Sequence, residues 1–381
     1  MRVIVVGAGV LGTMHAWQAI ERGHEVVHIE REEQARGASV RNFGLVWVGG
    51  RADGPELEVA LRARELWEGI GARVPGLGFR PAGSLTVVTN EAELAVARAA
   101  AERPDAAERG YRLLTPEEAR AVNPALRGEA VRGALYCEKD AAVEPRPAQR
   151  ALQDALRERA RGRYTFLGGR EVREVLPGRR AAVRDDHGEI HEGDALVLCT
   201  GAWTGGMVRE LTGGELPVRR VRLQMMQTAP LDEELTTAVA DADSFRYYPA
   251  YGGEALDAMA AAQSQTPVAD RHKMQLLMVQ RKDGSLTIGD THEYETPFGF
   301  DVQEEAYAHL TGVVERILGR ALPPVRRRWA GVYAQCTDGV SVVHRQRLRE
   351  DANAWLVTGP GGRGMTCSPA IAEDTANSLG W

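Results

Sequence analysis

The first thirty residues restrict the fold of this chain more than any other segment. They read MRVIVVGAGVLGTMHAWQAIERGHEVVHIE, which predicts a buried strand, a glycine turn, a helix and a second strand. Gly7, Gly9 and Gly12 have the spacing G-x-G-x-x-G. In that fingerprint the first glycine makes the tight turn, the second leaves room for a pyrophosphate, and the third lets helix and strand pack closely. The segment therefore predicts a Rossmann-like α/β domain that binds a dinucleotide.

The residues around the glycines fit this interpretation. The helix begins near Val10 and Leu11, where free N–H groups and the positive end of the helix dipole favour a phosphate. The second strand ends in Glu30, which is followed by Arg31. A carboxylate at Glu30 accepts ribose hydroxyls and repels the extra phosphate of NADP. A glycine turn without any ligand remains an alternative, and the fingerprint does not separate FAD from NAD.

The bulk composition excludes several classes of partner. The net charge is −6 over 381 residues and the basic residues are dispersed, so we expect no nucleic-acid partner. The four cysteines are far apart, which predicts neither a disulfide framework nor a metal site. The chain begins directly with a core strand and contains no apolar run of about 18 residues. We therefore expect a soluble, cytoplasmic protein with no membrane span.

Residues 36–50, RGASVRNFGLVWVGG, have the composition of a backbone that wraps closely past an extended cofactor. Small residues come first, a polar stretch follows, and an apolar strand ends the segment. An ordinary surface loop is the alternative. The residues expected to contact the cofactor are Ser39, Arg41, Asn42, Gly44 and Leu45.

Two further glycine-rich strand ends point to a flavin. In GDALVLCTGAWTGGM a buried strand stops at Thr200, Gly201 and Trp203, where doubly wound sheets place their ligands. In residues 354–379 a strand meets a glycine cluster and a helix follows, with Ser368 expected as N-cap and Pro369 at the first helical position. The helix start would aim its positive end at the N1–C2=O region of a reduced flavin. The expected cofactor contacts there are Gly359, Gly362, Arg363, Gly364, Met365 and Thr366. A second such junction, so far along the chain from the first, is hard to explain with NAD alone.

Seven pieces of the sequence, in family order, resemble the D-amino-acid oxidase (DAO) family of FAD-dependent amine oxidoreductases, which includes glycine oxidase and sarcosine oxidase. The pieces are GAGVLG, HIERE, GASVRNFG, LVLCTGAW, DGSLTIGD, WAGVYAQCTDG and TGPGGRGMTCSP. The resemblance implies an FAD-binding domain of the glutathione-reductase type, interleaved with a substrate domain of mixed or antiparallel sheet and helices. It assigns residues 1–80, 141–218 and 325–381 to the first domain, and residues 81–140 and 219–324 to the second.

The same resemblance makes two statements about the cofactor. Val172 corresponds to the residue whose backbone brackets the adenine, although an ordinary strand valine is equally compatible. Covalent sarcosine oxidases carry their flavin-linked cysteine several residues before the position of Cys336, where this chain has Gly331 and Val332. We therefore predict non-covalent FAD.

Between the cofactor segments the periodicity predicts several elements. Helices are expected over residues 91–102, 147–161 and 302–318, and a hairpin over residues 272–290 with its turn at KDGS. Residues 252–273, rich in alanine, are expected to form a partly mobile excursion over the site.

The substrate pocket departs from the amino-acid-oxidising pattern. Those relatives read Trp-x-Gly-Leu-Arg-Pro, with the arginine gripping the substrate carboxylate, whereas this chain has Tyr333 at that register. A carboxylate there would lack a cation. Either the substrate is a neutral or cationic amine, or its anionic group lies elsewhere. The proposed substrate contacts are Arg246, Tyr247, Tyr248, His272, Lys273, His292, Tyr333 and Arg363.

GDTHEY, RWAGVYA and GGRGMT resemble a branch of the family associated with aminophosphonate catabolism, so 2-aminoethylphosphonate or its N-methyl form is the favoured substrate class. A purely structural role remains an alternative for three of these features. SFRYYP is also compatible with a strand whose tyrosines pack under the cofactor, and His292 with a structural hydrogen bond. Residues 326–328 are most simply a solvated charge run that precedes a strand.

The resemblance implies oxidation of the C–N bond of a small primary or secondary amine, with hydride transfer to flavin N5 and hydrolysis of the imine to an aldehyde or keto compound. No acid or base is assigned, and no metal. Some relatives place a lysine where this chain has Thr287 and Ile288, so oxygen and other electron acceptors both remain open. The alternatives are a glycine, sarcosine or D-amino-acid oxidase, a dehydrogenase of a 2-hydroxy acid or glycerol phosphate, and a non-catalytic flavin-binding protein. The oligomeric state is not predicted.

Overall fold

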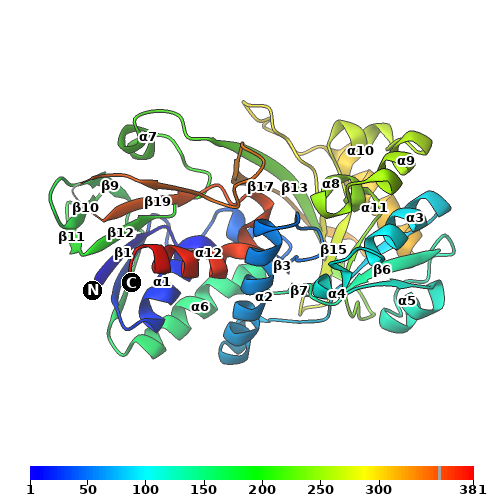
Figure 1. Cartoon of the computed structure of the whole chain (residues 1–381), viewed down its shortest axis with the longest axis horizontal. Coiled ribbons are helices and arrows are strands. Elements are labelled where there is room, and N and C mark those ends of the chain that lie inside the picture. The colour runs from blue at the N-terminus through cyan, green and yellow to red at the C-terminus, as the bar shows by residue number, and fades with distance from the viewer. Residues whose placement is uncertain (351–352) are drawn as a thin grey trace.

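A computed structural model describes residues 1–350 and 353–381 of the chain. It has a mixed α/β fold with one large sheet in each half of an elongated molecule (Figure 1). The N-terminus and the C-terminus lie in the same half, beside the smaller of the two large sheets. None of the described helices combines the length and the hydropathy needed to cross a membrane.

The first half is built on a six-stranded sheet. In spatial order its strands are β18 (His344–Arg347), β19 (Ala354–Thr358), β12 (Ala195–Leu198), β1 (Arg2–Val6), β2 (Glu25–Glu30) and β8 (Tyr164–Gly168). All neighbouring pairs are parallel except β18 and β19. Val3, Ile4 and Val5 are fully buried, because a parallel sheet of this kind is covered on both faces.

Helices cover one face of this sheet and a second, smaller sheet covers the other. The helices are α1 (Val10–Glu21), α2 (Pro55–Arg73), α6 (Pro145–Ala160) and α12 (Gly364–Ser378), which share one hydrophobic cluster with β1. The small sheet is β9 (Val172–Val175), β10 (Ala181–Asp185) and β11 (Ile190–Gly193). It packs against Ile4 and Val27 in a separate cluster. This is the architecture that the G-x-G-x-x-G segment predicts.

The second half is built on an eight-stranded, mainly antiparallel sheet. In spatial order its strands are β17 (Val325–Cys336), β13 (Val218–Pro230), β16 (Ser285–Gly289), β15 (Leu277–Gln280), β14 (Ala238–Ala240), β4 (Ser84–Val88), β6 (Gly133–Cys137) and β5 (Tyr111–Leu114). Only β14 and β4 run parallel. The chain thus enters this sheet twice, first with β4 to β6 and then with β13 to β17.

The remaining elements of the described residues are eight further helices, a two-stranded pair and four 3-10 turns. The helices are α3 (Glu91–Ala101), α4 (Ala106–Arg109), α5 (Pro116–Val122), α7 (Met207–Thr212), α8 (Asp243–Tyr247), α9 (Glu254–Ala262), α10 (Pro267–Arg271) and α11 (Glu304–Leu318), and β3 (Leu45–Val46) pairs with β7 (Ala141–Ala142). The 3-10 turns are η1 (Ala38–Val40), η2 (Pro75–Leu77), η3 (Pro249–Tyr251) and η4 (Gly361–Arg363).

The periodic segments fold as predicted. Helices α3, α6 and α11 lie within two residues of the expected bounds, and β15 and β16 form the expected hairpin. Residues 252–273 contain the short helices α9 and α10. The strand β17 hydrogen-bonds with β13 in the larger sheet, whereas the resemblance assigns residues 325–381 to the FAD-binding domain. The division into domains stays a prediction.

Two local expectations are wrong and one alternative is excluded. The strand considered as an alternative for SFRYYP does not form, because residues 244–247 belong to helix α8, with Arg246 and Tyr247 in its last turn. Helix α12 begins at Gly364, so Ser368 is not its N-cap and Pro369 lies inside it. The reason is that η4 runs directly into α12, and the Ser368 hydroxyl donates to the Gly364 carbonyl instead. Residues 326–328 do not precede a strand, because they form part of β17, where their side chains are exposed at the sheet edge.

Candidate active site

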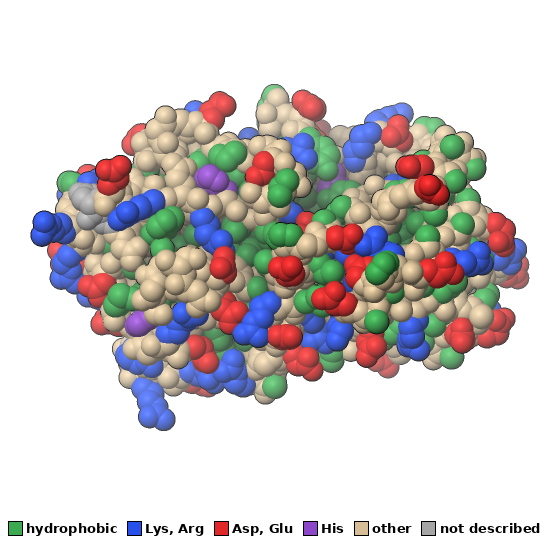
Figure 2. Space-filling model, in the orientation of Figure 1, with side chains coloured by type: hydrophobic (Ala, Val, Ile, Leu, Met, Phe, Trp, Pro, Cys, Tyr) green, Lys and Arg blue, Asp and Glu red, His purple; other side chains and the backbone are tan. Residues whose placement is uncertain are grey.

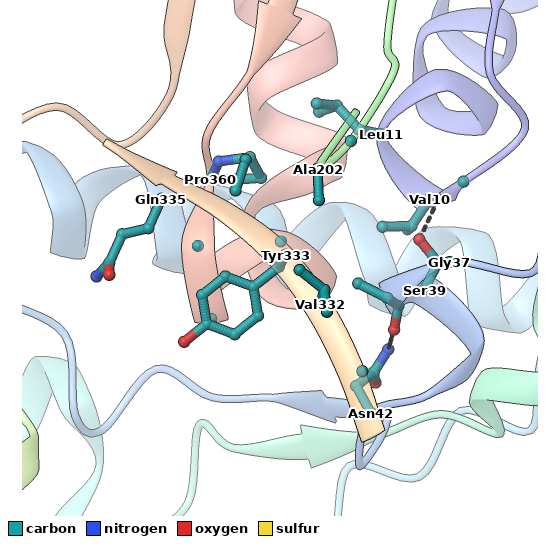
Figure 3. Close-up of a pocket in the computed structure, with 18 of the residues that line it drawn as sticks. Val10, Leu11, Gly37, Ser39, Asn42, Ala202, Val332, Tyr333, Gln335 and Pro360 are labelled. Atoms are coloured by element: carbon teal, nitrogen blue, oxygen red, sulfur yellow. Dashed lines mark hydrogen bonds between the residues drawn. The ribbon is translucent and has the colours of Figure 1, made fainter. Parts of the chain in front are cut away.

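A cavity of about 1060 Å³ extends from the glycine turn after β1 to the inner face of the eight-stranded sheet. Figure 3 shows its two sides, with Val10, Ser39 and Asn42 facing Tyr333, Gln335 and Pro360 across the opening. On the face drawn in Figure 2, acidic and basic side chains are interspersed, and hydrophobic side chains gather in the middle where the two halves meet. The cavity therefore lies where the two large sheets approach one another.

The glycines at the nucleotide end fit their predicted functions. Gly7 has a φ of 100°, and a Cβ there would lie 2.3 Å from the Cys199 carbonyl oxygen. A Cβ on Gly12 would lie 1.9 Å from the Gly7 carbonyl oxygen, so this glycine permits the close contact of helix and strand. Gly7, Gly9, Val10 and Leu11 line the cavity, whereas Gly12 lies behind it.

Glu30 joins the end of β2 to the glycine turn. Its Oε2 accepts a hydrogen bond from the Ala8 N–H at 2.7 Å, and its Oε1 accepts one from the Glu32 N–H at 3.2 Å. Arg31 stacks over the Trp203 ring, with its guanidinium carbon 4.9 Å from the ring centre. These residues and Val172 line the cavity at the same end.

The loop over residues 36–50 is held by its own side chains. The Ser39 hydroxyl accepts a hydrogen bond of 2.8 Å from the Val10 N–H, at the start of helix α1. Arg41 donates to the carbonyls of Arg36 and Ala330. The Asn42 side chain donates to the Ala38 carbonyl and accepts a hydrogen bond from the Gly44 N–H. Ser39, Arg41, Asn42 and Leu45 line the cavity, but Gly44 packs against the Val143 carbonyl outside it.

The C-terminal glycine junction reaches the same cavity. Gly362, Arg363, Gly364 and Met365 line it. Gly359 lies behind it, where a Cβ would be 2.8 Å from Val218 Cγ1. Thr366 also lies behind, and its Oγ1 accepts a hydrogen bond of 2.9 Å from the Trp47 N–H. The two junctions thus converge on one space, as the sequence predicts.

The wall between these junctions has buried polar atoms that suit a polar ligand. Thr200 and Gly201 line it at the end of β12, together with Trp203. The Thr200 hydroxyl and the Trp47 indole nitrogen are buried and have no hydrogen-bond partner among the described residues. Such orphaned groups are rare in proteins unless a ligand or water satisfies them. An elongated dinucleotide cofactor therefore fits the residues present.

The opposite end of the cavity is a chamber of aromatic side chains, which we call the tyrosine chamber. Its members are Tyr247, Tyr248, His292, Tyr294 and Tyr333. The Tyr247 ring stacks on His292 with centroids 4.2 Å apart, and it meets Tyr248 edge-on at 5.0 Å. Helix α8, the segment after β16 and strand β17 each supply part of the chamber.

The Tyr333 hydroxyl is buried within the chamber and is without a hydrogen-bond partner of normal geometry among the described residues. Figure 3 shows its ring projecting from β17 into the cavity. Burial raises its pKa well above the usual value, and the nearby Asp290 adds to the effect. The phenol therefore stays protonated and is free to donate a hydrogen bond to a ligand.

With this geometry described, the comparisons with known proteins decide the family. Residues 2–378 match the family described as DAO, FAD dependent oxidoreductase. The chain belongs to the DAO family. It is 27% identical to a glycine oxidase of Pseudomonas aeruginosa, over 99% of this chain and 94% of that one.

Solved structures show the same fold at lower identity. The glycine oxidase of Bacillus cereus superposes with a TM-score of 0.78 at 19% identity, over 100% of this chain and 94% of that chain. An L-proline dehydrogenase from P. horikoshii superposes with a TM-score of 0.78 at 22% identity, over 99% of this chain and 92% of that chain. The protein is therefore an FAD-dependent oxidoreductase of the DAO family, with the mixed α/β fold that the sequence predicts.

The cationic side chains predicted to bind the substrate mostly have hydrogen-bond or ion-pair partners within the protein. Arg246 pairs with Asp243 at 3.2 Å and donates to the Gln263 carbonyl. Arg363 pairs with Glu56 at 2.9 Å. Burial lowers the pKa of His292 to about 4, so its ring is neutral near pH 7, and its Nδ1 hydrogen-bonds the Lys273 carbonyl. All of these side chains line the cavity, but none is an unpaired cation.

His272 does not join the chamber, since its ring pairs with the exposed Glu305 at 2.6 Å and it is not among the residues that line the cavity. Lys273, by contrast, lines the cavity while its ammonium pairs with Asp270 at 3.2 Å near the surface.

Sequence reasoning missed Asp290, the most unusual side chain of the chamber. It is 4% exposed, and its Oδ1 has no hydrogen-bond partner among the described residues. Burial raises its pKa to about 8. The signal in the sequence is an acid placed directly after the buried strand β16, two residues before His292 in the GDTHEY segment.

Proposed function

We propose that this protein oxidises the C–N bond of a small primary or secondary amine and yields an aldehyde or keto compound after hydrolysis of the imine. Bound FAD would supply the hydride acceptor. One observation carries the proposal: a single cavity joins both glycine junctions to the tyrosine chamber. The similarity to a glycine oxidase supports an amine as the substrate.

The residues that line the nucleotide end would hold the cofactor without a covalent link. Gly7, Gly9 and Ser39 provide the close approach at the pyrophosphate, and Glu30 provides the ribose acceptor. Cys336 lines the cavity, but burial raises the pKa of its thiol above the usual value. Because the thiolate is the nucleophile, a thiol held in the protonated form does not favour covalent attachment.

The tyrosine chamber would hold the amine. Its aromatic faces attract a cationic or methylated nitrogen, and the Tyr333 hydroxyl donates to an acceptor on the substrate. The two arginines predicted for the substrate, Arg246 and Arg363, are each paired with a carboxylate, so neither is free to grip the carboxylate of a simple α-amino acid. These features favour an amine that is not anchored through a carboxylate at the Tyr333 register.

Aminophosphonates such as 2-aminoethylphosphonate are a second candidate, favoured by Arg220. This side chain lines the cavity and makes no ion pair with any described residue, while its guanidinium carbon lies 5.3 Å from the centre of the Phe298 ring. Lys273 lines the same cavity. A phosphonate needs several donors, and Arg220 together with the chamber hydroxyls would supply them.

Anaerobic mixing of the purified flavoprotein with a substrate panel tests both proposals. The panel contains glycine, sarcosine, D-alanine, 2-aminoethylphosphonate, N-methyl-2-aminoethylphosphonate, L-lactate and glycerol 3-phosphate. Loss of the flavin absorbance with an amine supports the proposal, and loss with lactate or glycerol phosphate alone contradicts it. Bleaching restricted to carboxylate amino acids contradicts the interpretation of Tyr333. Peroxide formation on admitting air then distinguishes an oxidase from a dehydrogenase.

A further inference from the structure

Asp290 is a buried carboxyl group that no protein cation neutralises. Among the described residues, its nearest basic group is His292, with Oδ2 and Nε2 3.9 Å apart, and burial keeps that imidazole neutral near pH 7. Its backbone is fixed by a 3.0 Å hydrogen bond from its N–H to the Gln275 carbonyl. The side chain lines the cavity and keeps one oxygen unpaired. The Gln275 side chain hydrogen-bonds the carboxyl group but leaves Oδ1 unsatisfied. Burying a carboxyl oxygen without a partner is costly, so a ligand that satisfies it would bind favourably.

The surroundings of Asp290 match the chemistry of an ammonium ion. Its charge raises the pKa of the tyrosines on every side of the chamber, which places the carboxyl group within electrostatic reach of all of them: Tyr247, Tyr248, Tyr294 and Tyr333. Aromatic faces and a carboxylate together are the usual components of a site for an alkylammonium group. The other charged or titratable side chains on the cavity wall here are Arg51, Arg220, Arg246, Lys273 and His292. Arg219 stacks on the Tyr294 ring, with its guanidinium carbon 4.2 Å from the ring centre. Arg246 and Lys273 face carboxylates of their own, and Arg51 lies beyond the Tyr248 ring, 5.9 Å from its centre.

We propose that Asp290 binds the ammonium group of the substrate and accepts a proton from it. This inference rests on the proposed function, because it assumes that an amine occupies the chamber. In the step, the N–H bond of the ammonium breaks and an O–H bond forms on the carboxylate, which leaves a neutral amine beside a neutral carboxyl group. No oxidant or reductant takes part. The amine then carries the lone pair that oxidation of its C–N bond requires.

The raised pKa of Asp290, about 8, agrees with this assignment. At pH 7 the group is mostly protonated in the free chamber. An arriving cation favours the carboxylate, so its binding displaces a proton into the solvent. Proton release on binding is therefore a property that a purely structural aspartate would not show.

Calorimetry with the FAD-loaded protein and tetramethylammonium tests the inference without turnover, since this cation has no N–H bond. We expect binding at pH 7 with release of a proton, detected by titration in buffers of different ionisation enthalpy. Asp290→Asn should weaken binding at least about 10-fold and abolish the proton release. Neutral tert-butanol, of similar size, should bind both proteins alike.

Asp241→Asn is the matched control. Asp241 is a partly buried aspartate whose pKa burial likewise raises to about 8, but it accepts a hydrogen bond from the Leu276 N–H and does not line the cavity. This variant should bind tetramethylammonium like the wild type. Flavin content and near-UV circular dichroism check that each variant is folded.

Three results would overturn the inference: a wild-type protein that binds no tetramethylammonium, binding without proton release, or equal affinity in Asp290→Asn. The wild-type measurements remain decisive if that variant fails to fold.

For any amine that bleaches the flavin, the rate of flavin reduction by Asp290→Asn should rise about tenfold per pH unit below the pKa of the amine, because only the free base then reacts. Cation binding without any bleaching would contradict the proposed function and leave the cation site in place.

Discussion

Arg363 and Glu56 form an ion pair between the C-terminal glycine junction and helix α2, with Nη1 and Oε2 2.9 Å apart. The residues are 307 positions apart in the chain, and both side chains are almost fully buried. Arg51 lies 3.7 Å from the other oxygen of Glu56. The Glu56 carboxylate therefore forms ion pairs with two arginines at the wall of the cavity.

Replacing Glu56 should destabilise the protein more than a surface change. Glu56→Ala leaves two buried guanidinium groups without their carboxylate, which should lower the free energy of unfolding by about 3 kcal/mol. Urea unfolding measures the loss. Glu58→Ala, exposed on the same helix, is the control and should change stability by less than about 0.5 kcal/mol. Equal effects of the two variants would show that the ion pair contributes nothing.

Gly12→Ala should reduce FAD binding although Gly12 does not line the cavity. The new methyl group would meet the Gly7 carbonyl oxygen at 1.9 Å, so helix α1 must move away from the glycine turn. We expect loss of most of the flavin, measured by absorbance of the purified protein. Gly69→Ala, at an open position of α2, should retain flavin and raise stability by about 0.5–1 kcal/mol. Full flavin content in Gly12→Ala would refute the packing argument.

Tyr333→Phe separates binding from stability. Because the Tyr333 hydroxyl has no hydrogen-bond partner of normal geometry among the described residues, its removal should leave the melting temperature unchanged or raise it. Substrate affinity should nevertheless fall about 5- to 10-fold, read as a rise in KM, if the hydroxyl donates to the substrate. Tyr307→Phe removes another buried hydroxyl that is unpaired in the described structure, on the core-facing side of α11, and should leave KM unaltered. A Tyr333→Phe enzyme with normal KM would exclude the donor role.

The raised pKa of Asp241 predicts that the free energy of unfolding falls as the pH rises. Burial, with Asp243 nearby, raises its folded pKa to about 8, so the folded state holds a proton that the unfolded state releases above its own pKa near 4. The free energy of unfolding should therefore decline as the pH rises from about 4 to 8. Asp241→Asn should melt at a higher temperature than the wild type at pH 8, with the gap narrowing towards pH 5. A constant gap across this range would contradict the assignment.

The sequence predicts the nucleotide end of the site well, because its geometry depends on local backbone. Gly7 lies at the cavity with a φ of 100°, Gly9 leaves space beside the Ser39 hydroxyl, and the hairpin of β15 and β16 follows from its KDGS turn. The C-terminal helix start was wrong because a 3-10 turn extends the helix by one further turn, which local propensities do not reveal.

The substrate end could not be predicted to the same degree, since it is assembled from side chains that meet only in three dimensions. The pairing of Arg246 with Asp243, and of Arg363 with Glu56, removes cations that the sequence alone leaves free. The unpaired state of Asp290 likewise depends on the burial of its neighbours rather than on its place in GDTHEY.

The order in which the cavity walls appear along the chain has a consequence for biosynthesis. Strand β19 joins the first sheet, helix α12 packs between α1 and α2, and the junction between β19 and α12 lines the cofactor cavity. A nascent polypeptide therefore cannot complete this cavity until residues 354–378 have left the ribosome. Cofactor loading must wait for that C-terminal junction, although the fingerprint at Gly7 is synthesised first.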